Sequence, residues 1–166
     1  MAQNFTQQLM LLHKIITFNY DDLDTLLKEY LAAGCQIFNM ELGIASHIRD
    51  SQYIIEAVSE NPFSLQAGVE LSVQDTYCNE VVEKNKTIHF SDAKKEERFK
   101  NHPVYINTGL ASYISTPIKV KGVIYGTLNF SSTKATGSNH TQQEVEMIEM
   151  MAQSVGKFIE LRYHKF

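Results

Sequence analysis

The segment from Gly109 to Ser132, GLASYISTPIKVKGVIYGTLNFSS, constrains the fold more than any other part of the chain. Two apolar runs, rich in β-branched and aromatic residues, flank the dipeptide Lys121-Gly122. A tight hairpin turn needs positive φ angles, which glycine adopts without steric cost. The segment therefore predicts a β-hairpin with its turn at this dipeptide. Both faces of the hairpin are largely apolar, so we expect a sheet that is covered on both sides.

A regular register across this turn makes specific predictions about which side chains share a face. One face carries Val120 with Val123, Ile118 with Tyr125, Thr116 with Thr127, and Ile114 with Asn129. The other face carries Tyr113 with Phe130, Ser115 with Leu128, and Pro117 with Gly126. The polar residues Thr116, Thr127 and Asn129 then lie together, where they either line a cavity or are satisfied locally. A bulge at Pro117 would change this assignment.

The remaining segments predict a mixed α+β fold. Apolar residues recur at helical spacing in residues 4–17, 23–38 and 141–159. Shorter runs predict strands at residues 41–49, 52–59 and 87–90, and a short helix at residues 75–84. This order predicts a central antiparallel sheet. We expect the terminal helices to pack on one face, and short helices plus loops to cover a pocket on the other.

Composition excludes several classes of protein. The chain has 166 residues, of which 43% are hydrophobic and 20% charged, as is usual for one globular domain. The net charge of −4 gives no indication of nucleic-acid binding. No apolar run approaches the ~20 residues that span a bilayer, and no signal-peptide pattern is present. Two cysteines are too few for a disulfide framework. We therefore expect a cytoplasmic protein that binds neither nucleic acid nor membrane.

Several segments resemble the GAF domain, in the form found in bacterial sensor histidine kinases and related signalling proteins. They are LGIASHI (42–48), LSVQDTYCNEVVE (71–83), HPVY (102–105), the hairpin (109–132) and EMMAQSVGKFIE (149–160). The resemblance implies a two-component-type sensor that passes its ligand state to an output domain such as a histidine kinase. It implies an N-terminal helix for dimerisation or linkage in residues 1–20 and the sensory domain in residues 21–166. The phospho-accepting and ATP-binding regions of a kinase are missing, so we expect a fragment or a stand-alone sensor.

The resemblance also bears on specialised members of this family. Members of the cyanobacterial phytochrome branch attach a bilin through a cysteine that directly precedes a histidine. Here Asn101 precedes His102, which argues against covalent bilin attachment, and we expect no cofactor. Methionine sulfoxide reductases of this family use several cysteines near the pocket, whereas this chain has Cys78 there without a resolving partner. The Asn-Lys-Phe-Asp-Glu set that is typical of cyclic-nucleotide-binding members is absent from this sequence.

Eight residues are candidate ligand contacts: Tyr77, Cys78, His102, Tyr105, Tyr113, Ser115, Thr127 and Asn129. Their combination of aromatic bodies with sparse polar groups is typical of a small-molecule pocket. We expect an unidentified small ligand between the sheet and the segments 75–84 and 102–109. Each tyrosine alone is better explained by packing, and His102 is explained at least as well by capping of a backbone group.

Cys78 leaves a second hypothesis open. The residue falls near the third position of a helix expected to begin around Asp75. Backbone amides and the helix dipole lower a thiol pKa at such a position, as a redox sensor requires. A free cysteine is also often a small buried hydrophobe. Cys35 lies on an apolar helix face, and we interpret it as core.

The residue patterns give no support for an enzyme or a metal site. The chain has no G-x-S-x-G, P-loop or zinc pattern. His47, His89 and His140 have no spacing to Asp, Glu or Cys that suggests metal ligation. We therefore expect neither catalytic nor metal-ligating residues.

The two ends of the chain predict self-association. Phe5, Leu9, Leu12 and Ile16 form an apolar stripe, and residues 145–159 carry more apolar residues than one sheet face needs. We expect a parallel homodimer through a bundle of terminal helices. Intramolecular packing alone is the alternative, and a ligand-free structural dimerisation module is the alternative function.

Overall fold

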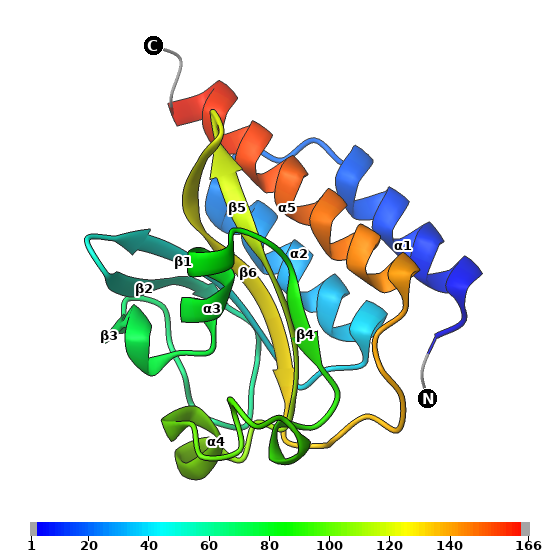
Figure 1. The fold of residues 1–166 in the computed structure, drawn as a ribbon. Coiled ribbons are helices and arrows are strands. Elements are labelled where there is room, and N and C mark those ends of the chain that lie inside the picture. The colour runs from blue at the N-terminus through cyan, green and yellow to red at the C-terminus, as the bar shows by residue number, and fades with distance from the viewer. Residues whose placement is uncertain (1–2, 164–166) are drawn as a thin grey trace.

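A six-stranded antiparallel sheet forms the centre of the computed structural model, which describes residues 3–163 (Figure 1). The strand order is β3-β2-β1-β6-β5-β4. The strands are β1 (Leu42–Arg49), β2 (Gln52–Val58), β3 (Glu70–Ser72), β4 (Ile88–Phe90), β5 (Ser112–Val120) and β6 (Val123–Ser132). No helix within these residues has the length and apolar character needed to cross a membrane.

Helices cover both faces of the sheet. Three long helices pack side by side on one face, α1 (Phe5–Thr17), α2 (Leu23–Phe38) and α5 (Gln142–Tyr163) (Figure 1). The short helices α3 (Cys78–Lys84) and α4 (Pro103–Thr108) belong to the opposite face, with 3₁₀ turns at Val73–Asp75 and Ala93–Lys95. The expected α+β architecture, with the terminal helices together on one face, is confirmed.

Each long helix begins at a polar residue that caps it. Asn4 and Gln7 exchange side-chain-to-backbone hydrogen bonds of 3.0 and 2.9 Å at the start of α1. The Asp22 carboxylate accepts a backbone hydrogen bond in the first turn of α2. Thr141 and Glu144 form a second reciprocal pair before α5, with both bonds at 3.1 Å. Such caps satisfy amides that have no partner within the helix.

The hairpin turn lies where the sequence places it. Lys121 and Gly122 have φ angles of 53° and 79°, and Val120 pairs with Val123 across the turn. Positive φ at both central positions is the geometry of a primed two-residue turn. This part of the prediction is confirmed.

A β-bulge in β6 makes the predicted register wrong beyond the turn. Lys119 pairs with Ile124 but Ile118 pairs with Gly126, so Tyr125 is an extra residue. The observed pairs are Pro117 with Thr127, Thr116 with Leu128, Ser115 with Asn129, Ile114 with Phe130, and Tyr113 with Ser131. One extra residue turns every following side chain to the other face. Thr127 and Asn129 therefore join Tyr113 and Ser115, and Thr116 lies on the face covered by the long helices.

The segment before α3 also differs from the prediction. Strand β3 at Glu70–Ser72 was not expected, and it pairs with β2 at the edge of the sheet. Ser72 makes no side-chain cap, and Val73–Asp75 forms a 3₁₀ turn instead of the first helical turn. The α-helix begins at Cys78. The helix expected over residues 75–84 is therefore shorter and starts later.

Only part of helix α1 packs into the hydrophobic core. Leu12 and Ile15 are buried against the other long helices, and Ile16 packs against the same core. Phe5 and Leu9 remain 50% and 45% exposed. The apolar stripe predicted for this helix is therefore divided, because only its C-terminal half packs inward.

Candidate functional site

Polar side chains gather inside the molecule between the sheet and α3. We call them the buried polar cluster, and its members are Ser46, Tyr53, Cys78, Tyr113, Ser115, Thr127 and Asn129. None of the seven is more than 3% exposed. The bulge in β6 assembles this cluster, because it turns Thr127 and Asn129 toward the β5 residues Tyr113 and Ser115. Five of the eight expected ligand contacts are members.

The Cys78 sulfur lies at the centre of the cluster. Its Sγ is 3.0 Å from the Tyr113 hydroxyl and 3.8 Å from the Ser115 hydroxyl. The Thr127 hydroxyl and the Asn129 amide donate to the sulfur at 3.2 and 3.4 Å. One side chain at the first position of α3 is thus connected to both strands of the hairpin.

The rest of the cluster extends to β1 and β2. The Asn129 amide donates to the Tyr53 hydroxyl at 3.0 Å. The Ser46 and Thr127 hydroxyls are 2.7 Å apart, and the Thr127 backbone amide donates to the Ser46 hydroxyl at 3.0 Å. Within residues 3–163, the buried side-chain atoms that have no hydrogen-bond partner lie outside this cluster. The cluster is therefore closed upon itself.

Burial controls the protonation of the cluster. It raises the pKa of the Cys78 thiol, and hydrogen bonds from the surrounding side chains oppose this only in part. Burial also raises the pKa of Tyr53 and Tyr113 well above the ordinary value, with the neighbouring Cys78 as a second cause. Of the two interpretations of Cys78, the buried small residue is the one found, and the direction of the thiol pKa shift is the reverse of what the redox alternative requires. All three groups are neutral at physiological pH and can donate hydrogen bonds.

Tyr77 and His102 lie beside the cluster and have structural partners. The Tyr77 hydroxyl donates to the Leu110 carbonyl at 2.8 Å, and its ring lies 5.2 Å from that of Tyr113. His102 packs on the Tyr77 ring at 4.8 Å, and its Nδ1 accepts the Val104 amide at 3.1 Å. His102 thus caps α4, which is the simpler of its two predicted roles. Burial lowers its pKa, and Asp75 opposes that shift.

Tyr105 is the most peripheral of the eight candidates. It is half-buried on α4 and packs against the apolar residues around the cluster. No residue of α4 is fully buried. The helix is therefore held by fewer internal contacts than α3, where Cys78 and Val81 are buried.

Ser46 and Tyr53 were missed from the sequence. Both lie on the β1–β2 pair, which the sequence predicted as strands without naming either residue as a site candidate. Alternation at the start of β2 provided a signal, since Tyr53 and Ile55 are both buried on the cluster side of the sheet. Ser46 is the small polar residue in an otherwise buried apolar run of β1. Among residues 3–163, no three His, Cys, Asp or Glu side chains are grouped to hold a metal ion.

A family model places the chain among known domains. The model for the GAF domain matches residues 22–159, which is most of the chain. No curated protein sequence matched. Many solved structures did, and those compared here share no more than 18% of their residues with this chain, so they show the fold alone.

Three of these structures cover almost the whole chain. The GAF domain of a phosphoenolpyruvate-protein phosphotransferase from Coxiella burnetii has a TM-score of 0.80 at 18% identity, covering 98% of each chain. Free methionine-R-sulfoxide reductase from Neisseria meningitidis, solved with its substrate, has a TM-score of 0.78 at 12% identity, covering 100% of this chain and 98% of that one. The phycocyanobilin-bound GAF domain of a cyanobacterial phytochrome has a TM-score of 0.75 at 15% identity, covering 99% and 100%.

Proposed function

Since this chain belongs to the GAF domain family, a family of signalling and ligand-binding domains, we propose that it is a non-enzymatic sensor that binds a small molecule at the buried polar cluster. The observation that carries the proposal is the cluster itself. Seven buried polar side chains occupy a region where aliphatic residues would pack at lower cost, because buried polar groups gain little unless every partner is present. A site that exchanges internal hydrogen bonds for bonds to a ligand explains their presence.

The chemistry of the cluster favours an uncharged ligand. It offers two phenols, three hydroxyls, one thiol and one amide, and none of these groups is charged at neutral pH. An ion placed there would lose its hydration without gaining a counter-charge. We infer a small neutral molecule with several hydrogen-bonding groups and no covalent link.

Ligand entry requires α3 and α4 to move away from the sheet. The sulfur of Cys78 bridges α3 to β5 and β6, so opening breaks the contacts of that residue first. α4 has no fully buried side chain and is the segment that moves at least cost. A ligand shifts this equilibrium by the difference in its affinity for the two states.

The strands that carry the cluster also support the terminal helices. Ile114 and Phe130 lie on the opposite face of β5 and β6 and belong to one core with Ile148 and Val155 of α5. A ligand that alters the hairpin therefore alters the surface on which α5 packs. We propose that this contact transmits the signal to a homodimer and to an output domain such as a histidine kinase, in the cytoplasm.

Exposed apolar residues support the proposed dimer. They are Phe5, Leu9 and Met10 on α1, and Met150 and Leu161 on α5. Size-exclusion chromatography with light scattering tests this part. A monomer at every concentration would remove the homodimer and leave the binding proposal to be judged separately.

Thermal unfolding against a panel of neutral metabolites tests ligand binding. A ligand at about 100 times its dissociation constant adds ~2.7 kcal/mol, which raises the melting temperature of a domain of this size by several degrees. We expect the shift to disappear in Asn129→Ala and to persist in Asn107→Ala, an exposed amide on α4 outside the cluster.

Two results would favour the other functions. A flat panel with a stable dimer would favour a ligand-free interaction module, a reading that the closed hydrogen bonding of the cluster also supports. A response to peroxide that is lost in Cys78→Ser would favour a thiol redox sensor. The raised pKa of this thiol argues against that outcome.

A further inference from the structure

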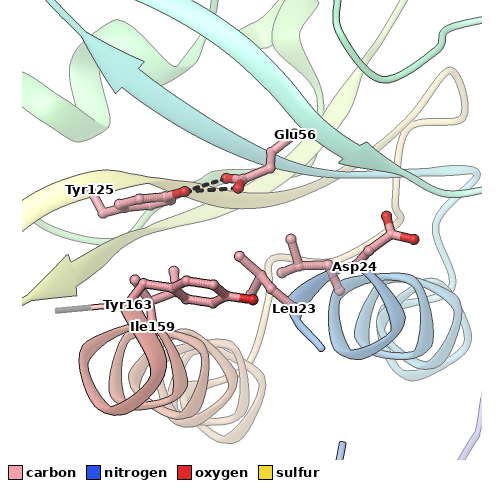
Figure 2. Close-up of a pocket in the computed structure, with 7 residues that line it drawn as sticks. Leu23, Asp24, Glu56, Tyr125, Ile159 and Tyr163 are labelled. Carbon is pink, nitrogen blue, oxygen red and sulfur yellow. Dashed lines mark hydrogen bonds between the residues drawn. The ribbon is translucent and has the colours of Figure 1, made fainter. Parts of the chain in front are cut away.

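A pocket lies on the other face of the sheet from the buried polar cluster, between the strands and the long helices. Its volume is about 380 Å³, at the lower end of the range for small-molecule sites. It is lined by Leu23, Asp24, Leu27, Glu56, Tyr125, Ile159 and Tyr163. Figure 2 shows Glu56 and Tyr125 on the strands, facing the side chains of α2 and α5 across an open space. The sheet thus separates this pocket from the buried polar cluster.

Two β-bulges aim the polar side chains of this pocket. Tyr125 is the extra residue of β6, as described above. On the other side of β1, Ala45 pairs with Ala57 and Ser46 with Ile55, so Glu56 is the extra residue of β2. Bulges re-aim side chains and are frequent next to functional sites. Here two of them direct a carboxylate and a phenol to one point across the intervening strand.

The Glu56 carboxylate keeps most of its capacity to accept hydrogen bonds. The Tyr125 hydroxyl lies 2.8 and 2.7 Å from its two oxygens, and Glu56 belongs to none of the ion pairs found among the described residues. A carboxylate has about four acceptor positions, so one hydroxyl donor leaves the others available. Two basic side chains lie nearby, since Arg49 acts electrostatically on Tyr125 and His47 stacks on the Tyr125 ring at 4.0 Å. The carboxylate is thus fixed in direction by Tyr125 and keeps acceptor positions for a further donor.

The other walls suit an apolar body. Leu27 and Ile159 are buried at the helix side, and Leu23 is half-buried beside them. Tyr163 adds an aromatic face, which attracts cations, whereas one face of the Tyr125 ring is stacked on His47 at 4.0 Å. Asp24 lies at the exposed rim, where it pairs with Lys28 at 3.0 Å. An acid with acceptor positions to spare, above an aliphatic and aromatic floor, favours a ligand that combines a hydrogen-bond-donating cation with apolar bulk.

We propose that this pocket binds a small organic ammonium compound, with its charged nitrogen on Glu56 and its apolar body against α2 and α5. The site is separate from the buried polar cluster and does not depend on ligand binding there. Its occupant contacts β2 and β6 on one side and the last turns of α5 on the other. It therefore acts on the same terminal helix as the proposed sensor.

Three probes of one shape and different charge test the proposal. They are phenethylamine, 2-phenylethanol and 3-phenylpropanoate, each titrated into the full chain labelled with nitrogen-15. We expect phenethylamine to bind with a dissociation constant at or below about 1 mM and the other two to bind at least about tenfold more weakly. Chemical-shift changes should map to Glu56, Tyr125 and Ile159. Equal binding of all three probes, no binding of the amine, or a map centred on Cys78 would each overturn the proposal.

Paired variants separate the charge from the fold. Glu56→Gln retains an acceptor for Tyr125 but removes the charge, and we expect it to weaken amine binding by at least about tenfold. Glu146→Gln removes an exposed acid of α5 outside the pocket and should leave binding unchanged. Unchanged affinity in a folded Glu56→Gln protein would refute the site. If that variant is unstable, Tyr163→Ala, at an exposed position of the wall, must weaken amine binding for the proposal to stand.

Discussion

Replacing Gly156 with alanine should push α5 away from β5. A Cβ atom at this position would lie 2.1 Å from the backbone oxygen of Lys119, whereas real contacts of this kind stay above 3.0 Å. The helix and strand must therefore separate by about 0.9 Å, the difference between the two distances. The obstacle is backbone, so no side chain can rotate out of the way. Only the helix or the end of the strand can move.

The expected cost follows from what that movement disturbs. Met151, Ala152, Val155 and Ile159 are buried on the same helix, and a gap of 0.5–1 Å forfeits about a quarter to a half of a dispersion contact. Overpacking of this kind costs about 1–3 kcal/mol, and a clash with backbone belongs at the upper end. Alanine in a helix regains about 1 kcal/mol over glycine. The net loss is about 2 kcal/mol, or a fall in melting temperature of about 4–8 °C.

Thermal and urea unfolding of Gly156→Ala measure this directly. Gly137→Ala is the matched control, because nothing lies within 4 Å of a Cβ at that loop position. We expect the control to remain within about 0.5 kcal/mol of the unmodified protein. If Gly156→Ala is as stable as the control, the close approach of α5 to β5 is not a constraint, and the reasoning fails.

Three further predictions concern titratable groups. In a Cys35→Ser background, Cys78 of the native protein should react with Ellman's reagent only as fast as the protein opens, because the thiol is buried and its pKa is raised. Rapid reaction at pH 7 would contradict the assigned environment. The Glu41 carboxylate accepts three hydrogen bonds of 2.7–2.8 Å from Ser132 and Thr133, which lower its pKa from 4.5. Its contribution to the stability of the folded protein is therefore present above pH 4.5 and is lost as pH falls below that value. Urea unfolding of Glu41→Gln should therefore show a deficit at pH 7 that shrinks toward pH 3, and a deficit independent of pH would disprove the assignment. Burial, with His140 as a second cause, lowers the pKa of His89 from 6.5. The unfolded chain therefore binds the His89 proton more tightly than the folded protein does, and stability falls as pH drops below 6.5. The slope of stability against pH between 7.5 and 5.5 should flatten in His89→Gln, and an unchanged slope would show that another group is responsible.

The sequence predicted features that depend on neighbouring residues. The turn at Lys121-Gly122 follows from local φ preferences, and the three long helices follow from apolar residues at helical spacing. The antiparallel sheet with its terminal helices followed from the order of these segments and was found as expected. These signals lie within single segments or in the order of the segments along the chain, so no knowledge of specific distant contacts is needed.

Features set by distant contacts were not predictable in the same way. The bulge at Tyr125 arises in the pairing of β6 with β5, which the sequence of β6 alone does not show. A regular register therefore placed Thr127 and Asn129 on the wrong face. The pKa of Cys78 depends on burial by strands far away in sequence, which outweighs its place at the start of α3. Ser46 joins the cluster only because β1 lies next to β6.

The two bulges have a consequence for how this domain tolerates changes in length. Insertions and deletions in strands usually shorten or extend a ladder, and hairpin ends absorb them. Deletion of Tyr125 would instead restore a regular ladder and exchange the two faces of β6 from Thr127 onward. Phe130 would turn out of the helix-side core, while Thr127 and Asn129 would enter it. A single lost codon would thus empty both candidate sites, so divergence in this strand is restricted to substitutions that keep its length.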